Sequence, residues 1–420
     1  MPNINDMPLY QASALLSSIV SQAQGREVLT PTNLGEFVSV ATTAIKKATD
    51  PIMRALVQMW GRTIYAVRPY QEKFASLFMD QERWGNVTRK ISFADTPIED
   101  DERFKYPCAW DTTQDPASGN GISTDMFKIR KDDPIETQFY GQAVYEDVRT
   151  EFLSSLETAF RSPEELMRYN AAAVLNRSNK LAQYRENIGR GLVLNLIGSL
   201  YYIANGLSPL GDSSRVIHLL TEYNSELGLT GDDALTSQTV LHPDNYPSFV
   251  RWVYARIGTL TDLMTERSTM FQTTIDGKAI NRHTGAQDQR IFILSKYLRM
   301  MDSMAKSVTF HDDLLKFGTV ESVAYWQSIR NPDQVDLANV ISLTGADGSV
   351  ITSALAAGST ALPNVFGLIH DRDALGYAMT RERSGVSPFN EAGEYWNTFL
   401  HINFRTVQDT TEKSVLLMLD

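Results

Sequence analysis

The clearest pattern of hydrophobic and polar positions starts at Ser162. Ser162, Pro163 and Glu165 form a capping box, in which a serine caps the helix and a glutamate follows three residues later. Hydrophobic residues then recur every three or four positions: Leu181, Tyr184, Ile188, Leu192, Leu196 and Leu200. The next proline is Pro209, so the pattern predicts a helix over residues 163–203, about 60 Å long at ~1.5 Å per residue. Each glycine inside it is unfavourable by ~1 kcal/mol relative to alanine, which allows a bend or a break.

The first 80 residues show helical periodicity as well, with expected breaks at Pro31, Pro51 and Pro69. Asp50 followed by Pro51 has the form of a helix cap and a first helical position. Hydrophobic residues then recur at three- and four-residue spacing: Ile52, Ala55, Leu56, Met59, Trp60 and Ile64. A helix with one apolar face needs another element to lie against. Residues 1–83 are therefore predicted to form a helical arm.

Residues 84–139 differ in character. Val87, Ile91 and Phe93 lie in a short β-type run, and a long polar excursion follows before a returning strand predicted near Met126–Ile129. Compact domains rarely keep so long an irregular segment without a function. Composition alone allows two interpretations equally: a surface insertion, or an extended hairpin that reaches a neighbouring subunit.

Residues 210–362 alternate short helical and strand patterns. Helices are predicted at Asn245–Thr261 and Thr309–Gly318, and strands at Arg290–Leu294 and Val340–Leu343. This segment is predicted to be a second lobe of mixed helix and strand.

The C-terminal segment returns to strands. Asn364–His370 is an apolar strand pattern, and Asp371–Leu375 after it predicts a helical turn. Residues 396–404 alternate hydrophobic and polar side chains, which is typical of a strand with one buried face. After a polar turn at Gln408–Lys413, Val415–Leu419 is continuously apolar, as in a buried strand.

Length and charge narrow the class of protein. The 420 residues exceed the ~250–300 at which single hydrophobic cores stop growing, so more than one lobe is expected. The net charge is −11, from 39 basic and 50 acidic residues. This disfavours direct sequence-specific nucleic-acid binding, since duplex-binding proteins concentrate positive charge. The start of the chain lacks a signal-peptide pattern, and the longest apolar stretch, around Leu192–Leu207, is too short to span a bilayer.

No pattern predicts catalysis. His242, His311 and His370 each lie within two residues of an aspartate, but none has the spacing of a metal site. Nucleophile-elbow and phosphate-loop motifs are absent from the sequence. Cys108, the single cysteine, lies between Tyr106 and Trp110, which favours packing. We therefore expect no enzymatic activity, no cofactor, no metal and no catalytic residue.

The order of arm, long polar hairpin, long helix, mixed lobe and C-terminal strands resembles the Hong Kong 97-type fold of tailed-phage major capsid proteins, an α+β fold. It is most similar to the coat of phi-29-type podoviruses. The resemblance is carried by Phe139–Gln142, by Phe160 before the capped helix, by Val365–Leu375, and by Tyr395–Asn397 with the strand through Phe404. That coat carries an additional C-terminal immunoglobulin-like domain, which we do not expect in a chain ending at Asp420.

The resemblance implies a division into five parts: an N-terminal helical arm (1–83), an extended hairpin loop (84–139), a peripheral domain with the long spine helix (140–209), an axial domain (210–362) and closing strands of the peripheral domain (363–420). It implies a coat protein that self-assembles, as pentamers and hexamers, into the icosahedral head shell around phage double-stranded DNA. The DNA would be contained and not read by sequence. A separate scaffolding protein and a portal protein are the implied partners, with no membrane. The implied location is the virion, after assembly in the host bacterial cytoplasm.

The resemblance also implies where copies meet. The extended loop would lie across a neighbouring subunit, and the loop at Arg383–Gly393 would meet neighbours at local three-fold points. The expected intersubunit contact residues are Asp100, Asp101, Glu102, Arg103, Lys105 and Arg383. Two alternatives remain open: an encapsulin-type nanocompartment shell, which shares the fold, and an α/β enzyme with residues 84–139 as a long lid.

Overall fold

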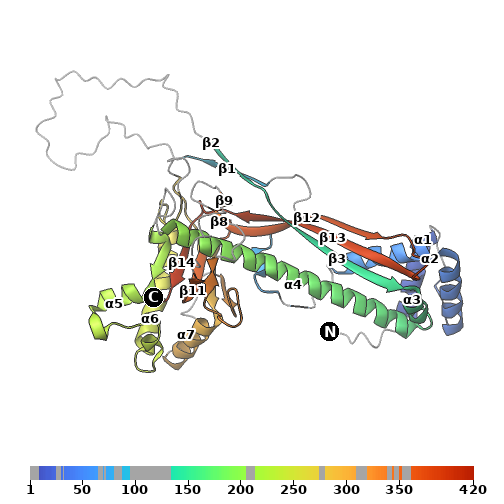
Figure 1. Ribbon diagram of the computed structural model, residues 1–420, viewed down its shortest axis with the longest axis horizontal. Helices are drawn as coiled ribbons and strands as arrows, with labels where there is room; N and C mark the ends of the chain where they lie inside the picture. The colour runs from blue at the N-terminus through green and yellow to red at the C-terminus, as the bar shows by residue number, and fades with distance from the viewer. Residues whose placement is uncertain are drawn as a thin grey trace, which may run out of the picture.

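The computed structural model describes the chain in separate ranges: residues 9–24, 30–31, 33–64, 70, 72–79, 88–94, 134–204, 213–273, 280–308, 319–337, 343–344, 350–351 and 361–420. The described part is elongated. One long helix runs along it beside a sheet of long strands, a group of helices lies at one end and a lobe at the other (Figure 1).

The long helix, α4 (Pro163–Ala204), has 42 residues and confirms the predicted helix of residues 163–203. The capping box is formed, since the backbone N–H of Glu165 donates to Ser162 Oγ at 3.2 Å. The glycines do not interrupt the helix. One of them, Gly189, allows Phe74 to pack directly on the helix, because a Cβ at Gly189 would lie 2.7 Å from that of Phe74.

A three-stranded antiparallel sheet lies along α4 in the order β12-β13-β3. Its strands are β3 (Gly141–Phe152), β12 (Leu375–Val386) and β13 (Tyr395–Gln408). β13 confirms the predicted alternation, with these hydrophobic or hydroxyl side chains buried: Trp396, Thr398, Leu400, Ile402 and Phe404. A buried ion pair between Arg177 on α4 and Asp147 on β3, with Nε and Oδ2 3.3 Å apart, joins the helix to the sheet.

The lobe is built on a five-stranded sheet in the order β4-β14-β11-β5-β6. Its strands are β4 (Val216–His218), β5 (Gln289–Leu294), β6 (Thr319–Val323), β11 (Val365–Asp371) and β14 (Ser414–Met418). Its helices are α5 (Leu219–Leu227), α6 (Tyr246–Thr265) and α7 (Ser295–Val308). The predictions at Asn245–Thr261, Arg290–Leu294, Asn364–His370 and Val415–Leu419 are confirmed by α6, β5, β11 and β14. The predicted helix at Thr309–Gly318 lies outside the described residues.

Segment 363–420 is shared between both sheets. β12 and β13 join the three-stranded sheet, whereas β11 and β14 pair with β5 and β4 of the lobe. The division of the chain into five parts stays a prediction. The chain crosses between the sheets at a tight turn, where the N–H of Ala374 donates to the carbonyl of Asp371 at 3.0 Å. Asp371 Oδ1 also accepts from the N–H of Asp373 at 2.8 Å, so residues 371–374 form a hydrogen-bonded turn between β11 and β12, where the sequence predicted a helical turn.

At the far end of α4 lie α1 (Leu9–Gln24), α2 (Leu34–Ile64) and α3 (Leu153–Ala159). The predicted break at Pro51 is wrong, because Pro51 lies inside α2. Asp50 does not act as the predicted cap: its carboxylate accepts a hydrogen bond from Trp396 Nε1 at 2.7 Å. Apolar packing of α1 and α2 with α3, α4 and Trp396 outweighs the hydrogen bond that a proline removes from a helix.

The remaining elements are short. The strands are β1 (Thr88–Phe93), β2 (Pro134–Phe139), β7 (Val335–Asp336), β8 (Leu343–Thr344), β9 (Val350–Ile351) and β10 (Ala361–Leu362). Among the described residues, 3-10 turns lie at Ala75–Leu77, Ser213–Arg215, Gly231–Asp233 and Thr239–Leu241. The predicted strand at Val340–Leu343 is described only at Leu343, in β8. In the described part of the chain no helix is both long and apolar enough to cross a membrane.

Candidate assembly surfaces

The hairpin of β1 and β2 stands apart from both main sheets. The strands pair antiparallel from Thr88 opposite Phe139 to Phe93 opposite Pro134. The hairpin leaves the body where the two sheets meet (Figure 1) and is joined to β3 through Tyr140 alone. The strand that returns to β1 is therefore β2. The predicted return near 126–129 lies outside the described residues, as do five of the six predicted contact residues: Asp100, Asp101, Glu102, Arg103 and Lys105.

The exposed face of the hairpin carries two large hydrophobic side chains beside the Arg89–Glu136 ion pair. Ile91 is 62% exposed and Phe93 is 59% exposed. A two-stranded hairpin is at best marginally stable by itself. Large exposed hydrophobic side chains gathered on one face are typical of interaction surfaces. This face of β1 is a candidate contact surface.

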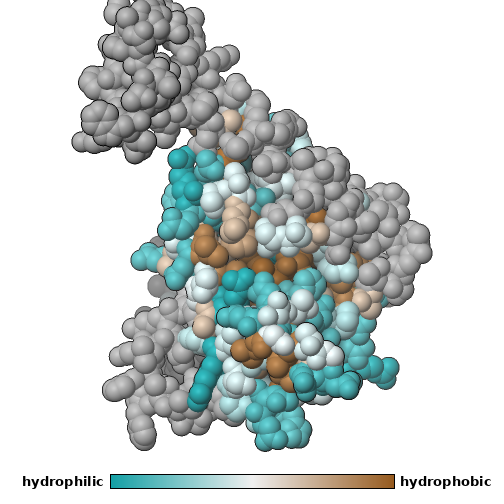
Figure 2. All heavy atoms as spheres, turned by 90° about the vertical axis from the view of Figure 1, so that its left-hand side faces the viewer, coloured by the Kyte–Doolittle hydropathy of each residue, from teal (hydrophilic) through white to brown (hydrophobic). Residues whose placement is uncertain are grey.

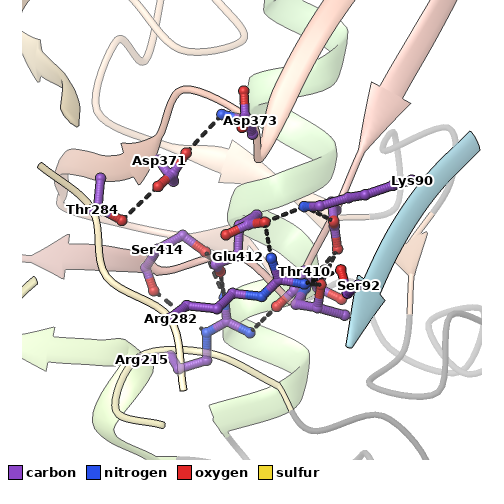
Figure 3. Close-up of polar contacts among 12 residues, drawn as sticks. Lys90, Ser92, Arg215, Arg282, Thr284, Asp371, Asp373, Thr410, Glu412 and Ser414 are labelled. Atoms are coloured by element: carbon purple, nitrogen blue, oxygen red, sulfur yellow. Dashed lines mark hydrogen bonds and ion pairs between the residues drawn. The ribbon is translucent and has the colours of Figure 1, made fainter. Parts of the chain in front are cut away.

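The inward face of β1 is polar and meets the body through a cluster of charges. We call Lys90, Arg282, Asp409 and Glu412 the root cluster. Lys90 Nζ lies 2.7 Å from Asp409 Oδ2 and also pairs with Glu412. Arg282 pairs with the same Glu412 carboxylate and donates to Ser92 Oγ of β1 at 3.3 Å. Figure 3 shows Lys90 pointing from β1 toward Glu412.

The carboxylates of the root cluster come from the turn between β13 and β14. Arg215, which is fully buried, holds this turn by donating to the carbonyls of Thr410 at 2.8 Å and Glu412 at 3.1 Å. The predicted polar turn at Gln408–Lys413 is thus present, but its residues from 409 onward are buried. Polar side chains in a turn usually indicate exposure, so no local signal revealed this burial.

The two buried carboxylates have different proton affinities. Burial raises the pKa of Asp409, but attraction to Lys90 and hydrogen bonds from Thr411 outweigh it, so the pKa lies below its usual value. Burial raises the pKa of Glu412 above its usual value, although Lys90 and Arg282 both oppose the change. As the pH falls, Asp409 therefore stays ionised, and paired with Lys90, to a lower pH than Glu412.

A cavity of about 560 Å³ opens beside the root cluster. Its lining mixes both signs of charge: Arg267, Arg282, Arg372, Asp288, Asp371, Asp373 and Glu412. The carboxylate of Asp371 already has a hydrogen-bond partner in the subunit, since Thr284 donates to its Oδ2. Among the described residues no group of three or more histidine, cysteine or acidic side chains is placed to hold a metal ion.

Arg383 is the one predicted contact residue that the structure describes. It is exposed on β12 opposite His401 and lines, with Arg381, a hollow of about 270 Å³. By strand register it shares the open face of the three-stranded sheet with three half-exposed hydrophobic residues of β3: Val144, Val148 and Phe152. The face opposite α4 therefore carries arginines along one edge and, along the other, hydrophobic residues that alternate with polar ones.

The lobe end offers another exposed surface. Viewed from that end, hydrophobic side chains gather in patches framed by hydrophilic ones (Figure 2). The large hydrophobic residues exposed on lobe segments are Leu227, Met270, Val320 and Ile329.

The histidines considered for catalysis do not form a site. His242 is exposed, with Nδ1 3.3 Å from Asp244. His370 is fully buried in β11, and burial lowers its pKa to about 4. His311 lies outside the described residues. An exposed ring and a fully buried ring do not line one solvent-facing site.

A self-associating shell subunit is the class of protein that this architecture indicates: an elongated body, a projecting hairpin and exposed apolar and charged faces. The family model of the Phi29-like phage major capsid protein matches residues 16–418. The chain therefore belongs to this family, and it is a structural coat protein of the phage head and not an enzyme. This confirms the resemblance seen in the sequence, and neither the encapsulin nor the enzyme alternative is favoured.

Solved phage capsids show a distant likeness. The capsid of Staphylococcus phage Andhra is 10% identical, covering 83% of this chain and 84% of its own, with a TM-score of 0.49. The cyanophage Pam1 capsid is 12% identical, covering 85% of this chain and 92% of its own, with a TM-score of 0.41. No curated protein matches the chain at a significant level.

Proposed function

We propose that each subunit of the head shell holds its neighbour by laying the loop of residues 84–139 across it. The observation that carries this proposal is the hairpin at the root of the loop. It belongs to neither main sheet, it projects from the body, and Ile91 and Phe93 are both more than half exposed. A second copy covers these side chains. The acidic run Asp100–Glu102, with Arg103 and Lys105, adds ion pairs that are weak singly, at ~0–1 kcal/mol, but repeat in every copy.

The other contacts follow from the exposed faces. Arg383 meets a neighbour at a local three-fold point, and the lobe meets its copies around pentamers and hexamers. A separate scaffolding protein directs closure, a portal protein occupies one vertex, and double-stranded DNA is contained. The net charge of −11 supports containment, because a shell of like charge to DNA does not bind it tightly. Assembly takes place in the host cytoplasm and the product is the virion shell.

The experiment that tests the proposal is assembly of the chain with its scaffolding protein, followed by electron microscopy. We expect closed shells from the parent chain and fewer shells from Arg383→Glu. Each contact loses an attraction of about 1 kcal/mol and gains a repulsion, and the change repeats in every copy. Arg383 is exposed, so circular dichroism and the melting temperature of the unassembled subunit are expected to stay unchanged. Undiminished shell formation by Arg383→Glu contradicts a contact at this residue, and a parent chain that stays monomeric contradicts the proposal as a whole.

A further inference from the structure

The hairpin is attached to the body differently by its two strands. On β1 the half-buried residues are Thr88, Lys90 and Ser92, all polar, whereas Ile91 and Phe93 are more than half exposed. β2 adds only the half-buried Ile135 and Phe139 as inward hydrophobic side chains. Directional polar contacts therefore carry much of the attachment. Such contacts hold one orientation and are lost when the geometry changes, unlike a broad apolar interface.

The acceptor side of the root cluster keeps its shape without Lys90. Asp409 Oδ1 accepts from the backbone N–H of Thr411 at 2.9 Å and from its hydroxyl at 2.6 Å. Glu412 is paired with Arg282 as well as with Lys90. Arg215 fixes the backbone of the turn through its hydrogen bonds to the carbonyl groups of Thr410 and Glu412. Asp409 and Glu412 thus form a preformed socket whose other donors belong to the body.

Lys90 itself is able to leave the socket. Its side chain is 23% exposed, so its ammonium group reaches water without crossing the core. The hairpin has a natural pivot as well, because Tyr140, which is 70% exposed, is the single residue between β2 and β3. The hairpin is thus held at β1 by an ion pair that can open. At β2 it is linked to the body by a single residue, about which it can rotate.

We propose that Lys90 is the latch of this hinge: seated between Asp409 and Glu412, it sets the direction in which the hairpin leaves the body, and unseated it lets the hairpin swing about Tyr140. The latch acts in the single subunit. Its biological role, presenting the loop to a neighbouring copy, rests on the proposed function, whereas its mechanical role does not.

The test is a distance measurement by electron spin resonance on the unassembled subunit. Spin labels are attached at Pro134→Cys, at the end of β2 away from Tyr140, and at Asn187→Cys on the exposed face of α4, in a Cys108→Ser background. The parent chain is expected to give one narrow distance distribution. Lys90→Gln is expected to give a distribution about twofold wider, because an unlatched ribbon moves as a loop does. Asp409→Asn removes the charge of the acceptor on the body and is expected to widen the distance distribution as well.

Two matched variants separate the latch from a general loss of charge or of fold. Arg89→Gln removes a positive charge from the adjacent residue, which points outward to Glu136 at 3.6 Å, and is expected to leave the distribution narrow. Lys90→Arg keeps the charge and is expected to restore the narrow distribution. The latch is overturned if Lys90→Gln is as narrow as the parent, or if Arg89→Gln widens the distribution equally. Failure of the parent to assemble would count against the proposed function only, since no shell is needed here.

Discussion

At the scale of single residues, His370 shows how the fold changes the chemistry of a side chain. It sits in β11 with no exposed surface, and its Nδ1 lies 2.7 Å from the carbonyl oxygen of Asp371. Its ring lies 5.3 Å from that of Phe292. Burial lowers its pKa to about 4, so the ring stays neutral in the folded protein at neutral pH. The pairing of β11 with β5 and β14 places the ring in the core.

Acid is therefore expected to destabilise the subunit through His370. An unfolded histidine binds a proton near pH 6.5, whereas the folded one resists until about pH 4. Below pH 6.5 the unfolded state binds more protons, so the free energy of unfolding falls as the pH drops toward 4. The contribution is on the order of 3 kcal/mol, at ~1.4 kcal/mol per pKa unit.

Urea unfolding of the unassembled subunit at pH 7 and pH 4.5 measures this effect. Other carboxylates titrate in the same range, so the informative quantity is the difference between the parent and His370→Gln. The variant is expected to lose less stability on acidification than the parent. Equal losses would show that His370 does not contribute to acid sensitivity.

At the scale of elements, α4 was predictable because its evidence is local. The capping box and the three-to-four-residue spacing lie within the helix itself. α2 was predicted only in part. The local preference of Pro51 for a helix start was overruled by apolar packing against α4 and by the use of Asp50 as an acceptor for Trp396, 346 positions away in the chain.

Alanine substitutions at two glycines of α4 distinguish the effect of helix propensity on stability from the effect of packing. Gly189→Ala is expected to destabilise the subunit by about 1–3 kcal/mol, the usual effect of overpacking. Its Cβ would lie 2.7 Å from that of Phe74, whose N–H is tied to Glu321 Oε1 at 2.6 Å and whose backbone is already left-handed. Gly191→Ala meets nothing within 4 Å and is expected to stabilise by up to ~1 kcal/mol through helix propensity alone.

The check is thermal or urea unfolding of both variants beside the parent. Opposite signs are expected for the two substitutions, although they lie two residues apart. The same sign for both would mean that the segment carrying Phe74 does not press on α4 in solution.

At the scale of the whole molecule, the core is divided. One cluster of buried residues fills the lobe and the adjoining half of α4, and a second lies between α1, α2, α3 and the start of α4. Separate clusters allow local opening at one end without unfolding of the other.

Phe37→Ala is expected to open the helical end selectively. Phe37 is fully buried in the second cluster, and truncating such a side chain lowers stability by about 3–5 kcal/mol. Hydrogen exchange is expected to show lost protection in α1, α2 and α3, with protection retained in β5, β11 and β14. Phe292→Ala, in the lobe cluster, is the matched control and is expected to give the reverse pattern. Uniform loss of protection from either variant would indicate one cooperative unit.

The candidate contact surfaces could be predicted only where the local pattern of hydrophobic and polar residues indicates them. The polar excursion after β1 allowed either a surface insertion or an extended hairpin, and the structure describes a pair of antiparallel strands at its root. The predicted contact residues between 100 and 105 lie outside the described part of the chain. The predicted contact at Arg383 stays a prediction, although its side chain is exposed. The root cluster was missed because Lys90 and its acceptors Asp409 and Glu412 are 319 and 322 positions apart.

The sequence by itself determined the long helix, the alternating strand at residues 396–404, the mixed class of helix and strand, and the resemblance to phage coat proteins. These depend on capping and periodicity, which are carried by residues close together in the chain. Tertiary structure alone decided that α2 continues through Pro51, that segment 363–420 divides between two sheets, and that the turn after β13 is buried as a socket for Lys90. Each of these depends on partners that are distant in the chain, and local pattern holds no information about which distant surface a segment meets.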